Sequence, residues 1–350
     1  MEKVLIAMSG GVDSSTAAHL ILDSGYDAIG GTMIVTSGLY GNAEGISSDA
    51  VMAAKICEKL NIKHKVIDLC DEFRKHVVGD FVDRYLEGKT PNPCIVCNKK
   101  IKFGALLDAA LSFGCDKIAT GHYANVEKTP SGRFILKTAL DSTKDQSYML
   151  WTLSQEQLSR CLFPLGSLTK PEVREMANGL TFENANQKDS QDVCFIPDGD
   201  YAGFIKNHAK FESVEGDYVD MQGKILGKHK GIIHYTVGQR KGLGIALGRP
   251  MFVHSKSALT NQVVLCENEE LFSKKLTASG VNLIATDNIE SPIRVYAKTR
   301  YHQVPALATA VQTDADKISV EFDQPVRAIS SGQSVVLYDG NVVIGGGFID

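Results

Sequence analysis

The sequence has no long hydrophobic run, and no stretch approaches the roughly 18 apolar residues that a membrane-spanning helix needs. Its first residues, MEKVLIAMSGG, predict a strand where a signal peptide would need a charged head and a long apolar core. The 8 cysteines are too few and too scattered for the disulfide framework of a secreted protein. We therefore expect a cytoplasmic protein that does not use a membrane.

An excess of positive charge is also lacking. The chain carries 37 lysines and arginines against 41 aspartates and glutamates, which gives a formal net charge of −4. This balance excludes a protein coated in positive potential. It leaves a nucleic-acid partner open, because a local basic patch is sufficient for binding.

Short apolar runs alternate with helical patterns up to about residue 205. The expected strands cover 4–8, 27–35, 64–69 and 117–124, and the expected helices cover 13–25, 48–61, 71–87 and 103–114. Such alternation implies parallel pairing with right-handed crossovers. We predict an α/β fold with a doubly wound parallel sheet, whose site lies beyond the carboxyl ends of the strands.

After about Ile205, hairpin signals replace the helical periodicity. Two segments, 217–227 and 334–349, each contain two short apolar runs around a turn. Regularly spaced strand patterns from about Leu276 onward predict a small β-barrel. We accordingly divide the chain into three predicted parts: an α/β domain (1–205), a central β-rich domain (206–275) and a C-terminal β-barrel domain (276–350).

The stretch AMSGGVDSS (7–15) follows the first predicted strand and opens the first helix. Its glycines allow an anion to approach the backbone, and the helix start offers free N–H groups and a positive dipole end. The loop matches neither a Walker A motif nor a Rossmann fingerprint. It resembles the pyrophosphatase loop of N-type ATP pyrophosphatases, which transfer AMP from ATP to an oxygen atom. The resemblance implies that ATP and Mg²⁺ are bound by Ala7, Met8, Ser9, Gly10, Gly11, Val12, Asp13, Ser14, Met33 and Gly121.

Three cysteines lie in contexts that predict exposure. Cys94 and Cys97 belong to TPNPCIVCNKKIKF (90–103), and Cys194 belongs to KDSQDVCFIP (188–197). A thiolate is favoured at a helix N-terminus beside cations. We expect Cys97 to meet both conditions, because the Pro-Asn-Pro turn ends just before it and three lysines follow. The polar segment around Cys194 predicts a mobile loop that can carry a reactive group.

Seven motifs occur in the order found in bacterial tRNA-specific 2-thiouridylases, and they span nearly the whole chain. They are SGGVDSS, TPNPCIVCNKKIKF, ATGHYA, KDQSYMLW, DSQDVCFI, YTVGQRKGLG and SGQSVVLYDG. The sequence therefore resembles that family, whose members convert the wobble uridine of certain tRNAs to 2-thiouridine. The implied first domain is of the adenine nucleotide alpha hydrolase type.

The resemblance implies roles for the cysteines. ATP would first join AMP to O2 of the uracil, which makes AMP a leaving group and releases pyrophosphate. Cys194 would accept sulfur as a persulfide from a sulfur carrier or a cysteine desulfurase. Cys97 would be the nucleophile that forms a transient disulfide with Cys194. The anticodon arm of the tRNA would be met by Asn92, Pro93, Cys94, His122, Lys144, Asp145, Gln146, Arg240, Arg300, Tyr301 and Gln333. We expect a monomer.

The sequence departs from this family at position 94, where some members carry an aspartate suited to proton transfer. Cys94 is then either a bystander near the target base or, with Cys97 and Cys194, a ligand of a [4Fe-4S] cluster that binds the incoming sulfur. A structural zinc site is disfavoured, because no second cysteine pair completes a tetrahedral shell.

Two rival functions remain in view. One is a different ATP pyrophosphatase, such as an amidotransferase-type synthetase acting on a small metabolite, which would need an ammonia-supplying domain. The other is a non-catalytic RNA-binding module whose cysteines bind metal. That module leaves the SGGVDSS loop unexplained.

Overall fold

The computed structural model describes residues 1–37, 39, 48–184 and 193–350. Its first layer is a parallel sheet in the order β3-β2-β1-β4-β7, and every neighbouring pair in it is parallel. The strands are β1 (Lys3–Ala7), β2 (Asp27–Ile34), β3 (Lys63–Asp68), β4 (Lys117–Ala119) and β7 (Cys161–Leu162). The predicted doubly wound parallel sheet is confirmed.

Apolar residues cover both faces of this sheet. Along β1, Val4 and Ile6 join one buried cluster while Leu5 joins another, as the alternation of a strand between two faces requires. The helices packed around the sheet are α1 (Val12–Asp23), α2 (Ser48–Lys59), α6 (Leu106–Ser112), α7 (Gln155–Ser159) and α8 (Lys170–Gly179). None of the described helices combines the length and apolar character needed to cross a bilayer.

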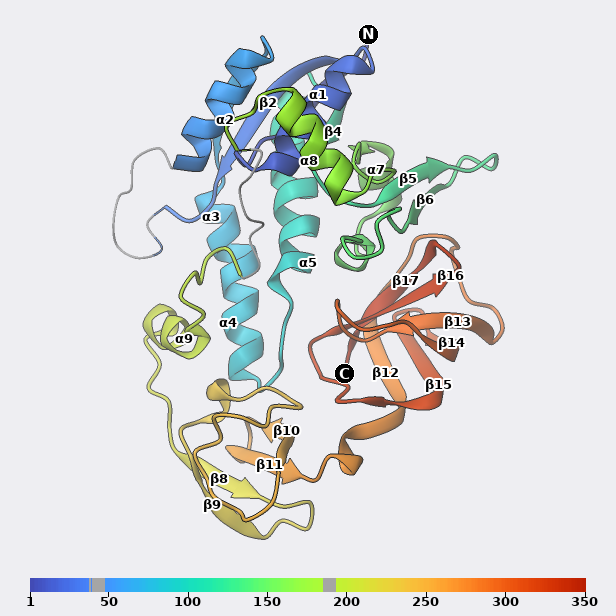
Figure 1. The fold of residues 1–350 in the computed structure, drawn as a ribbon. Helices are drawn as coiled ribbons and strands as arrows, with labels where there is room; N and C mark the ends of the chain where they lie inside the picture. Colours follow the sequence, from blue (N-terminus) through green and yellow to red (C-terminus); the bar gives the residue numbers. More distant parts are fainter. Residues whose placement is uncertain (38, 40–47, 185–192) are drawn as a thin grey trace.

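A long helical rod leads away from the sheet. It consists of α3 (Cys70–Phe73), the π-helical turn η1 (Arg74–Val78) and α4 (Gly79–Leu86). After α4 the chain turns back and enters α5 (Pro93–Cys97), the π-helical segment η2 (Asn98–Ala105) and then α6. Figure 1 shows this returning segment beside α4.

The second helix of this pair begins earlier than the predicted start at 103. Asn92 is its N-cap, and its side-chain oxygen accepts a hydrogen bond from the Cys94 backbone N–H at 3.1 Å. Pro93 occupies the first helical position, where a missing N–H costs nothing. Both cysteines of the Cys-x-x-Cys pair therefore lie inside the helix.

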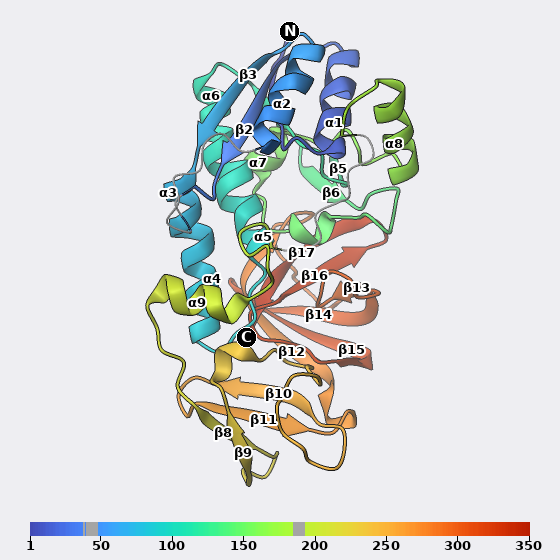
Figure 2. The ribbon, with the colours of Figure 1, turned by 60° about the vertical axis from the view of Figure 1, so that its left-hand side comes forward.

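Two β-modules follow the parallel sheet, and Figures 1 and 2 show them below and beside the helical rod. After α9 (Tyr201–Ala209), a four-stranded sheet in the order β10-β11-β8-β9 contains the first predicted hairpin. Its strands are β8 (Gly216–Val219), β9 (Ile225–His229), β10 (Phe252–Ser257) and β11 (Gln262–Cys266). Single 3₁₀ turns occur at η3 (Ser147–Met149), η4 (Ile232–His234) and η5 (Glu269–Leu271).

The last module is a closed antiparallel barrel. Its strand order is β12-β15-β14-β13-β16-β17, and the pairing of β12 with β17 closes it. The strands are β12 (Phe272–Leu283), β13 (Ile293–Lys298), β14 (Ala306–Asp314), β15 (Lys317–Arg327), β16 (Ser334–Asp339) and β17 (Val342–Ile349). The predicted barrel is confirmed, whereas the exact division of the chain into three domains stays a prediction.

A hairpin from the first half of the chain extends the barrel sheet. It comprises β5 (Asn125–Lys128) and β6 (Phe134–Lys137), and β6 pairs with β17. Close to this junction Trp151 is fully buried, with its ring 5.2 Å from that of Phe348. A Cβ added to Gly346 would lie 3.0 Å from the indole, so the indole packs directly on the barrel backbone.

Replacing Trp151 tests this seam. We expect Trp151→Ala to cost about 3–5 kcal/mol, because it leaves a cavity between the α/β part and the barrel. Trp151→Phe should cost clearly less, because it keeps an aromatic ring against Phe348. Thermal unfolding followed by circular dichroism measures the difference. Equal midpoints for the two variants would contradict the packing described here.

Candidate active site

The glycine loop joins β1 to α1 at the carboxyl edge of the parallel sheet. Gly10 has a φ of 74°, which favours glycine, and Gly11 is the N-cap of α1 without a side-chain cap hydrogen bond. The first N–H groups of α1 therefore face the loop without a capping side chain, as an anion site requires. The Ser14 hydroxyl donates to the Gly11 carbonyl at 2.9 Å and holds the turn closed.

Asp13 is held from two distant parts of the chain. The Lys170 ammonium lies 2.7 and 2.8 Å from its two carboxylate oxygens, and the Tyr123 hydroxyl donates to one of them at 2.8 Å. The Lys170 side chain is only 8% exposed. Its charge therefore offsets that of Asp13 beside the anion site, where a lone carboxylate would repel a phosphate.

The end of β4 packs tightly on the glycine loop. A Cβ added to Gly121 would lie 2.9 Å from the Asp13 backbone carbon and 3.0 Å from the Ser14 nitrogen, so only glycine fits there. Met33 lies near the end of β2, paired with Ile67, and is partly buried. The structure thus gathers the predicted nucleotide-binding residues at one edge of the sheet.

Beyond Gly121, the side chain of His122 turns towards η2. Its Nδ1 lies 2.7 Å from the Thr120 hydroxyl, and its Nε2 lies 3.4 Å from the Lys102 ammonium. His122 is 8% exposed, and burial followed by the charge of Lys102 holds its pKa well below the usual value. A tRNA contact of His122 stays a prediction, whereas its contacts with Thr120 and Lys102 are part of the fold.

The three predicted thiols lie together near Lys102. Cys94 and Cys194 are exposed, and Cys97 is partly exposed. The charges of Cys94 and Cys194 both act on Cys97, so the thiols lie within electrostatic range of one another. Residues 188–192 of the predicted mobile loop lie outside the described residues. The tertiary fold brings Cys94 and Cys97 close to Cys194, which lies about a hundred residues further along the chain.

The expected acidity of Cys97 is wrong. Burial raises its pKa to about 12, and the charge of Lys102 opposes this without overcoming it. Cys97 also lies at the fifth helical position of the segment that starts at Pro93, so it is Cys94 that occupies the first turn. Cys94 and Cys194 keep contact with solvent, yet the protein around them desolvates their thiols enough to raise the pKa values, again against the charge of Lys102. At neutral pH the resting site therefore holds thiols.

The predicted RNA-facing segment 144–146 lies against the barrel. Its Asp145 carboxylate accepts hydrogen bonds from the Ala139 and Ser147 backbone N–H groups at 3.0 and 3.2 Å. Burial and the nearby charges of Asp145 and Cys94 raise the pKa of Tyr301. Tyr301, which the sequence predicts as an RNA contact, therefore lies near Cys94. Gln146 pairs with the Tyr123 backbone through both its N–H and its side chain.

The linker before α5 is held by both β-modules. The Thr90 N–H donates to the Ser331 carbonyl at 2.9 Å, and the Gln333 amide donates to the Thr90 carbonyl at 2.7 Å. From the central sheet, the Lys256 ammonium donates to the Tyr235 carbonyl at 2.8 Å and contacts Lys89. Gln333, predicted as an RNA contact, therefore also fixes the entry to the thiol-bearing helix.

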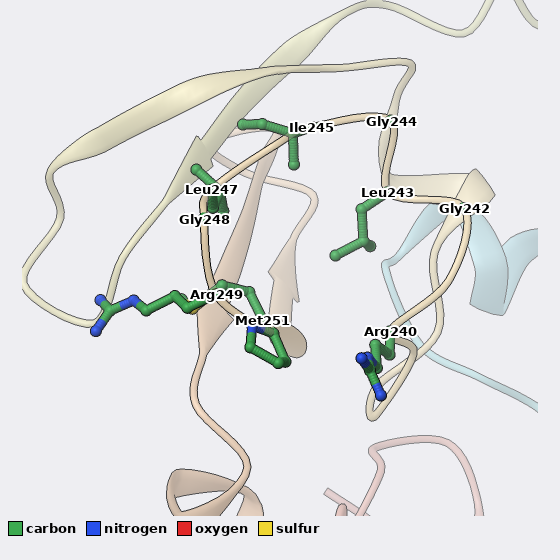
Figure 3. Close-up of a pocket in the computed structure, with 10 residues that line it drawn as sticks. Arg240, Gly242, Leu243, Gly244, Ile245, Leu247, Gly248, Arg249 and Met251 are labelled. Atoms are coloured by element: carbon green, nitrogen blue, oxygen red, sulfur yellow. The ribbon is translucent and has the colours of Figure 1, made fainter.

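A glycine-rich loop in the central module forms a basic cavity of about 420 Å³. Figure 3 shows the guanidinium groups of Arg240 and Arg249 at separate ends of the segment that lines it, with Leu243 between them. Arg240 is exposed, as a phosphate contact requires. Arg300, by contrast, donates to the carbonyls of Val237 and Ala328 and is partly buried, so it ties the barrel to the central module.

Four contributors to the site were not predicted. Lys170 and Tyr123 position Asp13, and the buried Asn184 donates to the Ser15 hydroxyl at 3.0 Å and to the Gly10 carbonyl. Lys102 was noted only as one of three lysines after Cys97. Each contact joins residues far apart in sequence, so local patterns carry no signal for the contact itself. The Thr-Lys-Pro-Glu start of α8 is typical of a helix N-terminus and could have located Lys170 on a helix.

The fold and the site define a class of protein: a nucleotide-using enzyme that combines a pyrophosphatase loop with a group of cysteine thiols. Three family models match in order, described as tRNA methyl transferase HUP domain (2–198), tRNA methyl transferase PRC-barrel domain (202–267) and Aminomethyltransferase beta-barrel domain (273–349). The chain belongs to the tRNA-specific 2-thiouridylase family.

Relatives of the same length carry this assignment. The tRNA-specific 2-thiouridylase MnmA of Clostridioides difficile (strain 630) is 48% identical over 355 residues, covering 100% of this chain and 98% of the relative. That of Treponema denticola is 46% identical over 357 residues, covering 99% and 98%. The U34-tRNA thiolase NcsA from Methanococcus maripaludis with its [4Fe-4S] cluster is 20% identical, with a TM-score of 0.35 over 60% of this chain and 64% of its own. That likeness is too distant to bear on the site.

The raised thiol pKa values predict a displaced pH profile. A raised pKa keeps the thiol protonated to higher pH, so alkylation of Cys194 and Cys97 should be slow at neutral pH. The rate should still be rising at about pH 9, the ordinary thiol value. Iodoacetamide labelling resolved by peptide mass spectrometry, with the denatured protein as control, measures it. A plateau reached by about neutral pH would contradict the environment described here.

Removing the cation beside Asp13 tests the anion site. We expect Lys170→Met to raise the KM for ATP about tenfold, or about 1.4 kcal/mol, because Asp13 then repels the phosphates. Lys55→Met is the matched control, since Lys55 pairs with Glu183 at an exposed site. The assay is pyrophosphate release with tRNA present. An unchanged KM in a folded Lys170→Met variant would contradict the proposed electrostatics.

Proposed function

We propose that this member of the tRNA-specific 2-thiouridylase family replaces O2 of the wobble uridine of tRNA by sulfur, using ATP and a persulfide. The observation that supports this most strongly is that the nucleotide-type anion loop and the group of thiols lie at the same edge of the parallel sheet. Gly121 packs on the anion loop, and His122, the next residue, contacts the lysine that faces the thiols. The rival synthetase and the non-catalytic RNA module explain only one half of this arrangement each.

The glycine loop supports nucleotide binding. The uncapped start of α1, the positive φ of Gly10 and the balanced charge of Asp13 suit a pyrophosphate whose charge Mg²⁺ screens. ATP supplies activation: once O2 of the uracil carries AMP, C2 has a good leaving group. We propose that Ser9, Gly10, Gly11, Asp13 and Ser14 bind the pyrophosphate. Met33 near the end of β2 and Gly121 after β4 would contact adenine and ribose.

The thiols then deliver sulfur in a balanced step. The Cys97 thiolate attacks Sγ of the Cys194 persulfide, forming the Cys97–Cys194 disulfide and expelling hydrosulfide with the electron pair of the broken S–S bond. Hydrosulfide adds to C2 of the activated uracil, and AMP leaves with the former O2. The transferred sulfur gains two electrons, which the two cysteines supply. An external dithiol or thiol reductant then restores both thiols.

The RNA surface is proposed from the described geometry. Asn92, Pro93 and Cys94 open the thiol-bearing helix and would surround a base that has left its stack. Gln333 binds Thr90 just before this helix, Tyr301 lies near Cys94 and Asp145, and Arg240 offers a phosphate contact further along. The partners that this chemistry requires are the tRNA anticodon arm and a persulfide-donating carrier or desulfurase. We propose a cytoplasmic monomer.

A cluster held by Cys94, Cys97 and Cys194 does not fit the donor geometry. Among the described residues, no three Cys, His, Asp or Glu side chains are arranged to hold a metal ion. No step of the reaction is therefore assigned to iron. Cys94 remains beside the predicted target base, in the first turn of the helix.

Cysteine variants separate the two halves of the reaction. We expect Cys97→Ala and Cys194→Ala each to abolish 2-thiouridine formation, because each removes one sulfur of the exchange. Both should keep tRNA-dependent AMP release, because activation of O2 precedes sulfur transfer. Cys266→Ala, at a buried thiol in β11 of the central sheet, is the control. Full thiolation by either active-site variant would refute the proposed function.

A further inference from the structure

The helix that bears Cys97 changes its pitch immediately after it. η2 (Asn98–Ala105) is π-helical, and the Leu106 N–H donates to the Ile101 carbonyl five residues back. In an α-helix, the residue five positions after Cys97 would lie roughly 140° away around the axis. The wider π-turn brings position i+5 back towards the same face, and such turns are frequent at functional sites. In this chain, position i+5 is Lys102.

His122 holds the Lys102 ammonium in place. An ammonium has no acceptor, so His122 Nε2 must accept at 3.4 Å and Nδ1–H must donate to the Thr120 hydroxyl at 2.7 Å. The imidazole contacts the rings of Phe103 and Phe163, with each centroid 5.8 Å away. A buried neutral acceptor therefore fixes the position of the cation without neutralising its charge.

The charge of Lys102 reaches all three thiols. It opposes the rise that burial causes in the pKa values of Cys94, Cys97 and Cys194, and for Cys94 and Cys97 it is the strongest influence after burial. Lys99 and Lys100, on the same segment, are exposed to solvent. On the barrel side, Tyr301 is the titratable neighbour of Cys94.

We propose that Lys102 is the electrostatic positioning residue of sulfur transfer: its ammonium, fixed by His122, stabilises the thiolate that each exchange at Cys97 and Cys194 forms. This inference rests on the proposed function. As Cys97 attacks the persulfide, one negative charge moves from Cys97 to the departing hydrosulfide, and it stays within the field of the same cation. Lys102 keeps its proton, and the proton of Cys97 passes to water or buffer.

The test compares Lys102→Met and Lys102→Gln with Lys102→Arg, and uses Lys100→Met as the matched control on the exposed side of η2. The first readout is the pH dependence of Cys97 and Cys194 alkylation in tRNA-free protein. We expect both neutral variants to shift it by about one unit to higher pH, or about tenfold slower labelling at a given pH. Lys102→Arg should recover most of the wild-type profile, and Lys100→Met all of it.

The second readout is 2-thiouridine formation, which should fall at least tenfold in both neutral variants while tRNA-dependent AMP release persists. Circular dichroism identifies the variants that fold, and Lys102→Gln serves if Lys102→Met does not. An unchanged alkylation profile in a folded neutral variant overturns the inference. So does an arginine variant no better than glutamine. Because alkylation needs no tRNA, these outcomes stand apart from the cysteine variants, whose full activity would refute the proposed function itself.

Discussion

The contact between Gly121 and the glycine loop is the constraint on which the site depends. With no room for a side chain, the end of β4 lies directly on Asp13 and Ser14. The neighbours of Gly121 then face the other way, where Thr120 orients His122 and His122 orients Lys102. The segment 120–122 thus fixes the distance between the glycine loop, where ATP would bind, and the thiols, which would act on the adenylated uridine. Any displacement of β4 would move both centres together.

The β-modules contribute by holding the entry to the thiol-bearing helix. Ser331 and Gln333 from the barrel bind Thr90, while Lys256 from the central sheet reaches Lys89. Burial lowers the pKa of Lys256 to about 8, so its placement is costly and is maintained by these backbone contacts. A substrate that binds both β-modules would therefore also affect the linker at Lys89 and Thr90, which positions Cys94 and Cys97. The architecture suits a macromolecular substrate better than a small metabolite.

Local sequence patterns predicted the parallel sheet, the anion loop, the barrel and the set of cysteines, because periodicity, turn chemistry and motifs are local. They failed where the outcome depends on distant packing. The Pro-Asn-Pro sequence favours a turn, yet Asn92 and Pro93 serve equally well as cap and first residue of a helix. The acidity of Cys97 was misjudged because its burial comes from segments remote in sequence. Nothing in the sequence marks the π-helical turn or the pairing of Lys170 with Asp13 across 157 positions.

We propose that two cysteines supply the electrons for sulfur transfer at a site activated by the neighbouring anion loop. A single turnover of persulfide-loaded protein with tRNA and ATP, without reductant, tests this most directly. The Cys97–Cys194 disulfide, identified by peptide mass spectrometry, is counted against the 2-thiouridine formed. We expect one disulfide for each thiolated tRNA, and no 2-thiouridine when ATP is omitted. Stoichiometric 2-thiouridine with both cysteines still reduced would contradict it.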